Sequence, residues 1–210
     1  MRDCLTTENS EPINVQALLL EIRDGNHAVI GRLLESYSSY LAVLARIQIG
    51  RRLRGKADPL DIVQEVFLDA HRQMQQFRGT TEAEFSAWLR RILAGQIALL
   101  LRRFLGTKGR DIQMERELTM QIDHSSHIMD RGLMANDSTP SQHAARREQS
   151  VLLAEALTKL PADYREVIIL RHLETLSFLE VSQRMNRSED SVQKLWVRAL
   201  ASLRRSMGES

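Results

Sequence analysis

The chain has 210 residues, a formal net charge of +2 and only 5% aromatic residues, and Leu, Ala, Arg, Glu and Gln recur along it. This composition favours helices over sheets. The single cysteine, Cys4, excludes an internal disulfide and a thiol cluster for zinc, and the sequence after Met1 lacks the basic start and apolar run of a signal peptide. We therefore expect an all-α, cytoplasmic protein without a metal, a cofactor or a membrane-inserted segment.

Apolar residues recur at helical spacing in four segments of the N-terminal half. The pattern predicts helices over residues 13–23 and 27–49, a third helix that begins at Asp58-Pro59, and a fourth that follows residues 78–81 and ends near Gly106. Asp can cap a helix start, and Pro is tolerated in the first turn. In the third helix we expect the core-facing stripe to consist of Leu60, Val63, Phe67, Ala70, Met74 and Phe77.

Charge is distributed unevenly over these helices. Acidic residues of the third helix recur on a face other than the apolar stripe: Asp58, Asp61, Glu65 and Asp69. Residues 85–110 carry no acid and six cations, namely Arg90, Arg91, Arg102, Arg103, Lys108 and Arg110. Either run could be a solvated face or an interaction surface, and the residues alone leave both interpretations open.

The helical pattern fails between Gly106 and about Gln142, where residues 137–140 (DSTP) are typical of a loop. We interpret this part of the chain as a flexible linker between two small helical domains. Periodicity returns at Val151 and continues through short helices to Met207.

The C-terminal part predicts a helix-turn-helix. Ser177 and Glu180 fit a capping box, Asn186-Arg187 predicts a tight break, and Ser188 can cap a second helix. In this arrangement the second helix can enter the major groove of DNA, although a helical hairpin that only packs has the same pattern. Trp196 shares the apolar stripe and is assigned to the core. The outward face carries donors and acceptors suited to phosphates and base edges: Arg187, Ser188, Asp190, Ser191, Gln193, Lys194 and Arg198.

Four motifs in this order resemble the extracytoplasmic-function (ECF) group of RNA polymerase sigma factors. They are residues 58–70 (DPLDIVQEVFLDA), 77–79 (FRG) with 85–92 (FSAWLRRI), 160–167 (LPADYREV) and 176–181 (LSFLEV). The resemblance implies a sigma-2-like domain over residues 13–105, a linker over 106–148 and a sigma-4-like domain over 149–207. Its implied partners are core RNA polymerase and promoter DNA, and it leaves open an anti-sigma factor.

The same resemblance implies the functional residues. Core polymerase would bind the third helix through Asp58, Asp61, Gln64 and Glu65. The minus-ten region of the promoter would meet Arg78, Arg90, Arg91, Gln96, Arg102 and Arg103. The recognition helix would read the minus-thirty-five element, and its residues 190–195 (DSVQKL) differ from those of many relatives, which implies a different upstream sequence.

Two other classes of function remain as alternatives. A helix-turn-helix regulator without a polymerase role would lack the motif at residues 58–70 and would usually carry a sensory domain. An enzyme would need a phosphate loop, a nucleophile elbow or a metal constellation, and the sequence contains none of these. We therefore expect a transcription initiation factor without catalytic activity.

Overall fold

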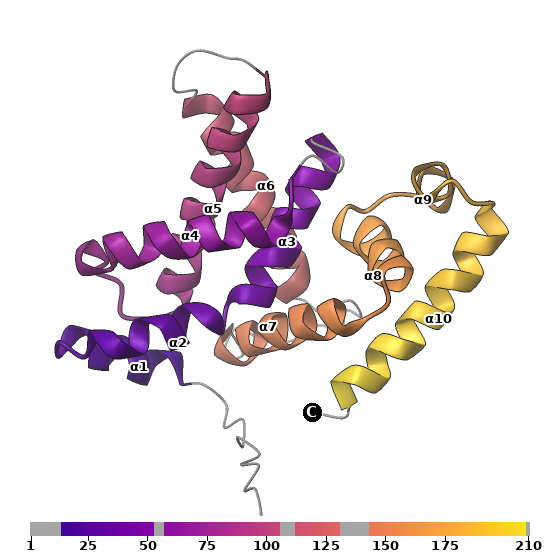
Figure 1. The fold of residues 1–210 in the computed structure, drawn as a ribbon. Helices are drawn as coiled ribbons and strands as arrows, with labels where there is room; N and C mark the ends of the chain where they lie inside the picture. Colours follow the sequence, from indigo (N-terminus) through magenta and orange to yellow (C-terminus); the bar gives the residue numbers. More distant parts are fainter. Residues whose placement is uncertain (1–13, 53–56, 106–111, 131–142, 209–210) are drawn as a thin grey trace, which may run out of the picture.

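The computed structural model describes residues 14–52, 57–105, 112–130 and 143–208, and the regular elements in these ranges are all helical (Figure 1). The N-terminal half contains α1 (Val15–Arg23), η1 (His27–Val29), α2 (Ile30–Glu35), α3 (Ser38–Arg52), α4 (Pro59–Gln73), η2 (Met74–Gln76) and α5 (Glu82–Leu105). It is followed by α6 (Ile112–Asp130), α7 (His143–Lys159), α8 (Ala162–Ile168), the π-helix η4 (Ile169–Leu173), α9 (Phe178–Met185) and α10 (Glu189–Gly208). Within the described ranges, no helix combines the length and the apolar character needed to cross a bilayer.

Helix α3 is the centre of the fold. It packs against α4, α5, α6 and α7, so Leu41, Leu44, Ala45 and Ile47 are fully buried along it. Figure 1 shows α3 between the N-terminal helices and the helices that follow α6. Because α3 is covered on several sides, it connects the two halves of the molecule in one apolar core.

The single helix predicted over residues 27–49 is wrong, because the chain forms η1, α2 and α3 there. The break lies at Ser36 and Tyr37, where the Ser36 hydroxyl donates to the carbonyl of Leu33 at 2.7 Å. The amide of Tyr37 donates to the carbonyl of Leu34, which is the tighter three-residue hydrogen bond. A serine that bonds to the preceding turn competes with the helical ladder, and the helix ends at this point.

The apolar stripe predicted for the third helix is also partly wrong. The Asp58 side chain accepts from the Leu60 amide at 2.9 Å and Pro59 occupies the first turn, so the predicted helix start is confirmed. The buried face of α4, however, consists of Ile62, Val63, Val66 and Ala70, and Leu60 is 57% exposed.

Helix α6 lies within the segment that we expected to be a flexible linker. It packs mainly on α5 and also on α3 and α7, with Leu118, Ile122 and Met129 fully buried. Ser125 and Ser126 are buried on the same face, and the Ser126 hydroxyl bonds to the Tyr40 hydroxyl at 2.8 Å. The linker prediction is therefore corrected for residues 112–130, while the predicted loop at 137–140 lies outside the described residues.

The C-terminal helices form the predicted helix-turn-helix. The Ser177 hydroxyl accepts from the Glu180 amide at 3.2 Å, and the Glu180 carboxylate accepts from the Ser177 amide at 2.8 Å, so the capping box is present. These hydrogen bonds to Ser177 hold the pKa of the Glu180 carboxyl below its ordinary value. Asn186 ends α9 in the left-handed conformation at φ 52°, which Asn tolerates better than most residues. Helix α10 then packs against α8, α9 and α7.

Candidate functional site

The exposed face of α4 combines carboxylates with two leucines. Asp61, Gln64 and Glu65 are all exposed, as expected for a binding surface. Leu60 and Leu68 are 57% and 50% exposed, and they lie two turns apart beside Gln64. Sequence reasoning placed Leu60 in the core and overlooked Leu68, although the run of four apolar residues in Ile62, Val63 and Val66 to Phe67 could have indicated a different buried face. An apolar centre with charged margins is typical of protein interfaces.

The loop between η2 and α5 is held in place by several polar contacts. The Arg23 guanidinium donates to the carbonyls of Arg78 and Gly79 at 2.7 and 2.9 Å. The amides of Thr80 and Thr81 donate to the Glu84 carboxylate at 2.8 and 3.0 Å. Because the carboxylate accepts these hydrogen bonds, the pKa of Glu84 lies below its ordinary value. Sequence reasoning did not identify Arg23, which is 55 residues from Arg78.

Gly79 is required by the close packing of the same loop. A Cβ at this position would overlap the Phe77 ring and would lie 2.9 Å from the Cβ of Glu84. The Phe77 ring in turn packs against Phe85 and Trp88, with ring centroids 5.6 and 4.9 Å away. The loop backbone therefore rests on an aromatic cluster at the start of α5.

Arg90 does not reach the surface, contrary to our expectation of a promoter contact. It is 7% exposed and its Nε donates to the Asp123 carboxylate at 2.5 Å. Its Nη1 donates to the Tyr40 and Ser86 hydroxyls at 3.2 and 2.8 Å. Arg90 thus joins α5 to α3 and α6, because a buried guanidinium needs an acidic partner and further acceptors.

The other expected promoter residues of this half divide into free and bound groups. Arg78, Arg91 and Arg103 are exposed. Gln96 donates to the Asp69 carboxylate at 2.5 Å, and Arg102 forms an ion pair with Glu115 at 3.6 Å. The structure therefore leaves three of the six side chains exposed at the surface.

On α10, the structure places the predicted residues on one outward face. Arg187, Ser188, Asp190, Gln193, Lys194 and Arg198 are exposed and Ser191 is partly exposed. The Ser188 hydroxyl accepts from the Ser191 amide at 3.3 Å, which confirms Ser188 as the cap. Lys194 forms an ion pair with Asp190 at 2.7 Å, and Arg187 forms one with Asp163.

Val197 was not identified from the sequence as part of this face. It is 58% exposed and lies between Lys194 and Arg198. Its helical position, one turn after Gln193 and Lys194, is the signal that could have found it. An apolar side chain in this position can contact the methyl group of thymine.

Trp196 packs inside the C-terminal half, as predicted. Its Nε1 donates to Nε2 of His172 at 2.9 Å, and the two rings stack at 5.9 Å. His172 must be neutral to accept this hydrogen bond. Burial lowers the pKa of His172, and the neighbouring Arg171 lowers it further, so the neutral form is favoured.

Both halves of the chain match known protein families. Residues 36–104 match the family described as Sigma-70 region 2, and residues 150–203 match the family described as Sigma-70, region 4. The chain is similar to the ECF RNA polymerase sigma-E factor of Haemophilus influenzae, with 27% identity over 180 residues that cover 84% of this chain and 86% of the relative. The factor of the same name from Escherichia coli K12 is 26% identical over 179 residues, which cover 84% and 85%.

A solved structure of the RsbN–BldN complex aligns with 89% of this chain and 97% of the other, at 24% identity and a TM-score of 0.31. The two matched regions of the sequence coincide with the α4–α5 surface and with the helix-turn-helix of α9 and α10. The chain belongs to the extracytoplasmic-function family of RNA polymerase sigma factors.

Proposed function

We propose that this protein binds core RNA polymerase through the exposed face of α4 and directs it to promoters that α5 and α10 read. The observation that carries the proposal is the α4 face, where Asp61 and Glu65 flank the exposed Leu60 and Leu68. Apolar side chains in the centre of such a face supply binding energy, and carboxylates at its margin align a basic partner.

The basic residues of the α5 side fit contacts to the DNA backbone. Arg78, Arg91 and Arg103 are exposed and can neutralise phosphates. Gln96 is held by Asp69 and can hydrogen-bond to a base edge only after this contact is exchanged. We place Arg90 outside the contact set because its guanidinium is already bonded to Asp123, Tyr40 and Ser86.

On α10, the outward face fits the major groove of the upstream element. The N-terminal residues of a recognition helix contact base edges, and those further along or beside it contact the backbone. Asp190, Gln193 and Lys194 lie in the first two turns and Arg198 follows one turn later. Such a protein selects the promoter while the polymerase carries out the chemistry, so we propose no catalytic role for it and expect it to act in the cytoplasm, together with the polymerase.

Charge reversal on α4 tests this function. We expect D61K/E65K to weaken binding to core polymerase by at least tenfold, because repulsion replaces attraction at the margin of the interface. Binding is measured by titration of labelled protein with core polymerase, and circular dichroism checks that the helix content is unchanged.

The matched control is D24K/E35K, which reverses two exposed acids on the N-terminal helices and changes the net charge equally. The control should bind as the wild type does. Equal affinity of both double variants would contradict the assignment of the α4 face to polymerase binding.

A further inference from the structure

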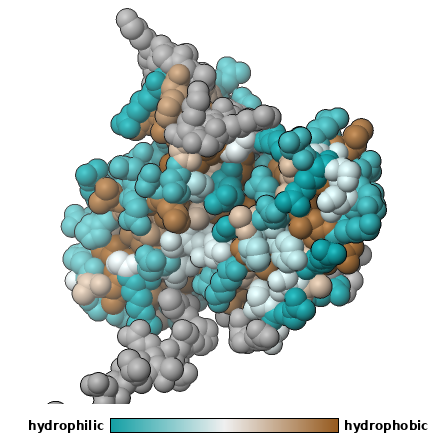
Figure 2. All heavy atoms as spheres, turned by 45° about the vertical axis from the view of Figure 1, so that its right-hand side comes forward, coloured by the Kyte–Doolittle hydropathy of each residue, from teal (hydrophilic) through white to brown (hydrophobic). Residues whose placement is uncertain are grey.

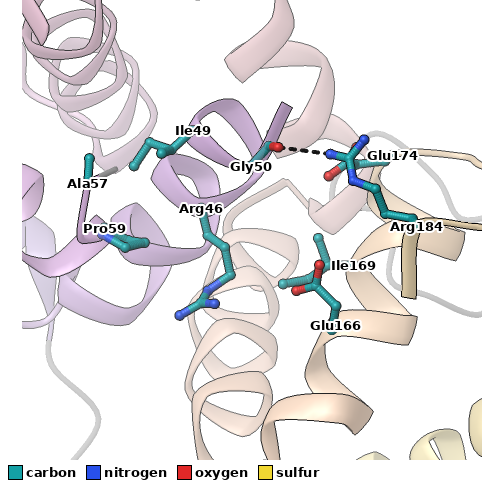
Figure 3. A pocket seen from close by; sticks show the side chains of 9 residues that line it. All are labelled: Arg46, Ile49, Gly50, Ala57, Pro59, Glu166, Ile169, Glu174 and Arg184. Atoms are coloured by element: carbon teal, nitrogen blue, oxygen red, sulfur yellow. Dashed lines mark hydrogen bonds between the residues drawn. The ribbon is translucent and has the colours of Figure 1, made fainter. Parts of the chain in front are cut away.

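A direct hydrogen bond joins the two halves of the molecule at the end of α3. Nη2 of Arg184, on α9, donates to the carbonyl of Gly50 at 2.9 Å (Figure 3). Gly50 lies in the last turn of α3, where backbone carbonyls lack partners within the helix and favour a cation. Arg184 therefore caps a helix that is 134 residues away in the sequence.

A cavity of about 360 Å³ lies beside this hydrogen bond. Arg46, Ile49, Ala57 and Pro59 line it from one half and Glu166, Ile169, Glu174 and Arg184 line it from the other. Figure 3 shows Arg46 on the wall that faces Glu166 and Ile169.

Opposite charges face each other across this boundary. Burial raises the pKa of Glu166, as does the charge of Glu174, while the nearby charges of Arg46, Arg184 and Arg165 act in the opposite direction. The halves also meet where α7 packs along α3 and α6, and the hydroxyl of the buried Ser150 donates to the Asp130 carboxylate at 2.5 Å. The boundary thus combines a mostly apolar contact with a polar, partly open cluster at the end of α3.

The closed arrangement limits the distance between the two DNA-reading surfaces. Gln96 is six residues from Arg90, which bonds to Tyr40, and Gly50 is ten residues further along α3. Lys194 is ten residues from Arg184 through the helix-turn-helix. At a rise of 1.5 Å per helical residue, these steps place Gln96 and Lys194 within roughly 60 Å of each other.

Promoter elements centred about 25 base pairs apart are separated by about 85 Å of straight B-DNA. The closed arrangement cannot span this distance. We infer that the contact of Arg184 with Gly50, together with the charges of Arg46 and Glu166, is an autoinhibitory latch that must open before both promoter elements are bound. This inference rests on the proposed function, since the latch is inhibitory only for a protein that reads two separated elements.

Spin-label distances test whether the latch holds the free protein closed. Labels are placed at Q73C and A201C, two exposed positions on α4 and α10, in a C4S background. We expect one short, narrow distance for the wild type and a longer, broader distribution for R46E, which places an acid opposite Glu166 and Glu174. The charge swap R46E/E166R should restore the short distance, and R205E, an exposed arginine away from the boundary, should leave it unchanged.

Transcription tests whether the latch is inhibitory. With core polymerase and a promoter template, we expect R46E to reach half-maximal transcription at a concentration about fivefold lower than the wild type, because more of the free protein is in the competent state. The maximal yield should be unchanged, and the charge swap should return to the wild-type value. R184Q opens the latch from the other half and should act in the same direction as R46E.

Each remaining result decides one of the two proposals. A wild-type distance distribution as broad as that of R46E would overturn the latch. Opened variants with an unchanged half-maximal concentration would overturn its inhibitory role. Absence of transcription with every form, wild type included, would contradict the proposed function, while the distances would still show whether the halves are latched together.

Discussion

Arg90 and Arg91 are neighbours in the sequence with opposite environments. Arg90 is buried among Asp123, Tyr40 and Ser86, whereas Arg91 is exposed. A buried cation with three partners contributes to stability, and an exposed one contributes mainly to contacts with other molecules. Adjacent arginines therefore have different roles, which spacing alone does not reveal.

We expect R90A to destabilise the fold and R91A to weaken promoter binding. Removing Arg90 leaves Asp123 without its cation and should lower the free energy of unfolding by about 3 kcal/mol, measured by urea denaturation. R91A should change stability by less than about 0.5 kcal/mol and should reduce the salt dependence of holoenzyme binding to DNA. A stable R90A protein with reduced DNA affinity would show instead that Arg90 contacts the promoter.

Two residues of α10 separate base reading from backbone contact. Lys194 lies in the second turn and Arg198 one turn later, and both are exposed. We expect K194A to change which bases are tolerated in the upstream element, because this side chain projects from the part of the helix that enters the groove. R198A should weaken binding to all sequences and flatten its dependence on salt.

A library of promoters transcribed with each variant measures both effects, and E189A on the same helix serves as the control. Unchanged sequence preferences with K194A and unchanged yields with R198A would remove α10 from the DNA interface.

At the scale of elements, α8 and η4 are connected to α10 by a titratable contact. The Trp196 indole donates to neutral His172, and burial lowers the pKa of His172 below the ordinary value of 6.5. Between the two pKa values the unfolded chain binds more protons than the folded one, so stability is retained above about pH 6.5 and is lost as the pH falls below it.

The melting temperature of the C-terminal half should therefore decrease as the pH is lowered from 7 towards 5. It can be followed by the fluorescence of Trp196 in a W88F background. H172Q, whose amide oxygen can accept the same hydrogen bond, should lack this component of the pH dependence. An equal decrease in H172Q would assign the titration to other groups.

Helix α6 shows why one element escaped prediction from the sequence. Its buried face contains Leu118, Ile122 and Met129, and the positions between Ile122 and Met129 are occupied by Ser125 and Ser126. Serines interrupt an apolar pattern, yet here Ser126 is bonded to Tyr40 of α3, a residue that no local pattern connects with it. Caps and turns, such as Asp58 and the capping box at Ser177, were predictable because their partners lie within three residues.

Hydrogen exchange measures whether α6 is a stable part of the fold. We expect the amides of Leu118 and Ile122 to exchange at least 100-fold more slowly than those of an unstructured chain, because both side chains are fully buried against neighbouring helices. D123N removes the charge opposite Arg90 and should accelerate this exchange. Rapid exchange throughout residues 112–130 of the wild type would restore the interpretation of a flexible linker.

At the scale of the whole molecule, the binding surfaces are distributed over separate helices. The α4 face lies on one half and the α10 face on the other, and the closed boundary at Gly50 joins them. Figure 2 shows hydrophobic residues in separate patches among hydrophilic ones on the face that it presents. The sequence predicted both helices and their outward residues from local periodicity. It could not predict the boundary, which depends on contacts between residues more than 100 positions apart.

The loop of residues 77–84 has a thermodynamic consequence for promoter capture. Fixing the backbone of a flexible residue costs about 1–2 kcal/mol in conformational entropy. This loop is already immobilised by Arg23, by the Glu84 carboxylate and by the packing of Gly79 on Phe77, so most of that entropy is lost when the protein folds. Association of the loop with single-stranded DNA therefore proceeds from a preorganised surface, and its temperature dependence reports on unstacking of the DNA bases and little on ordering of the protein.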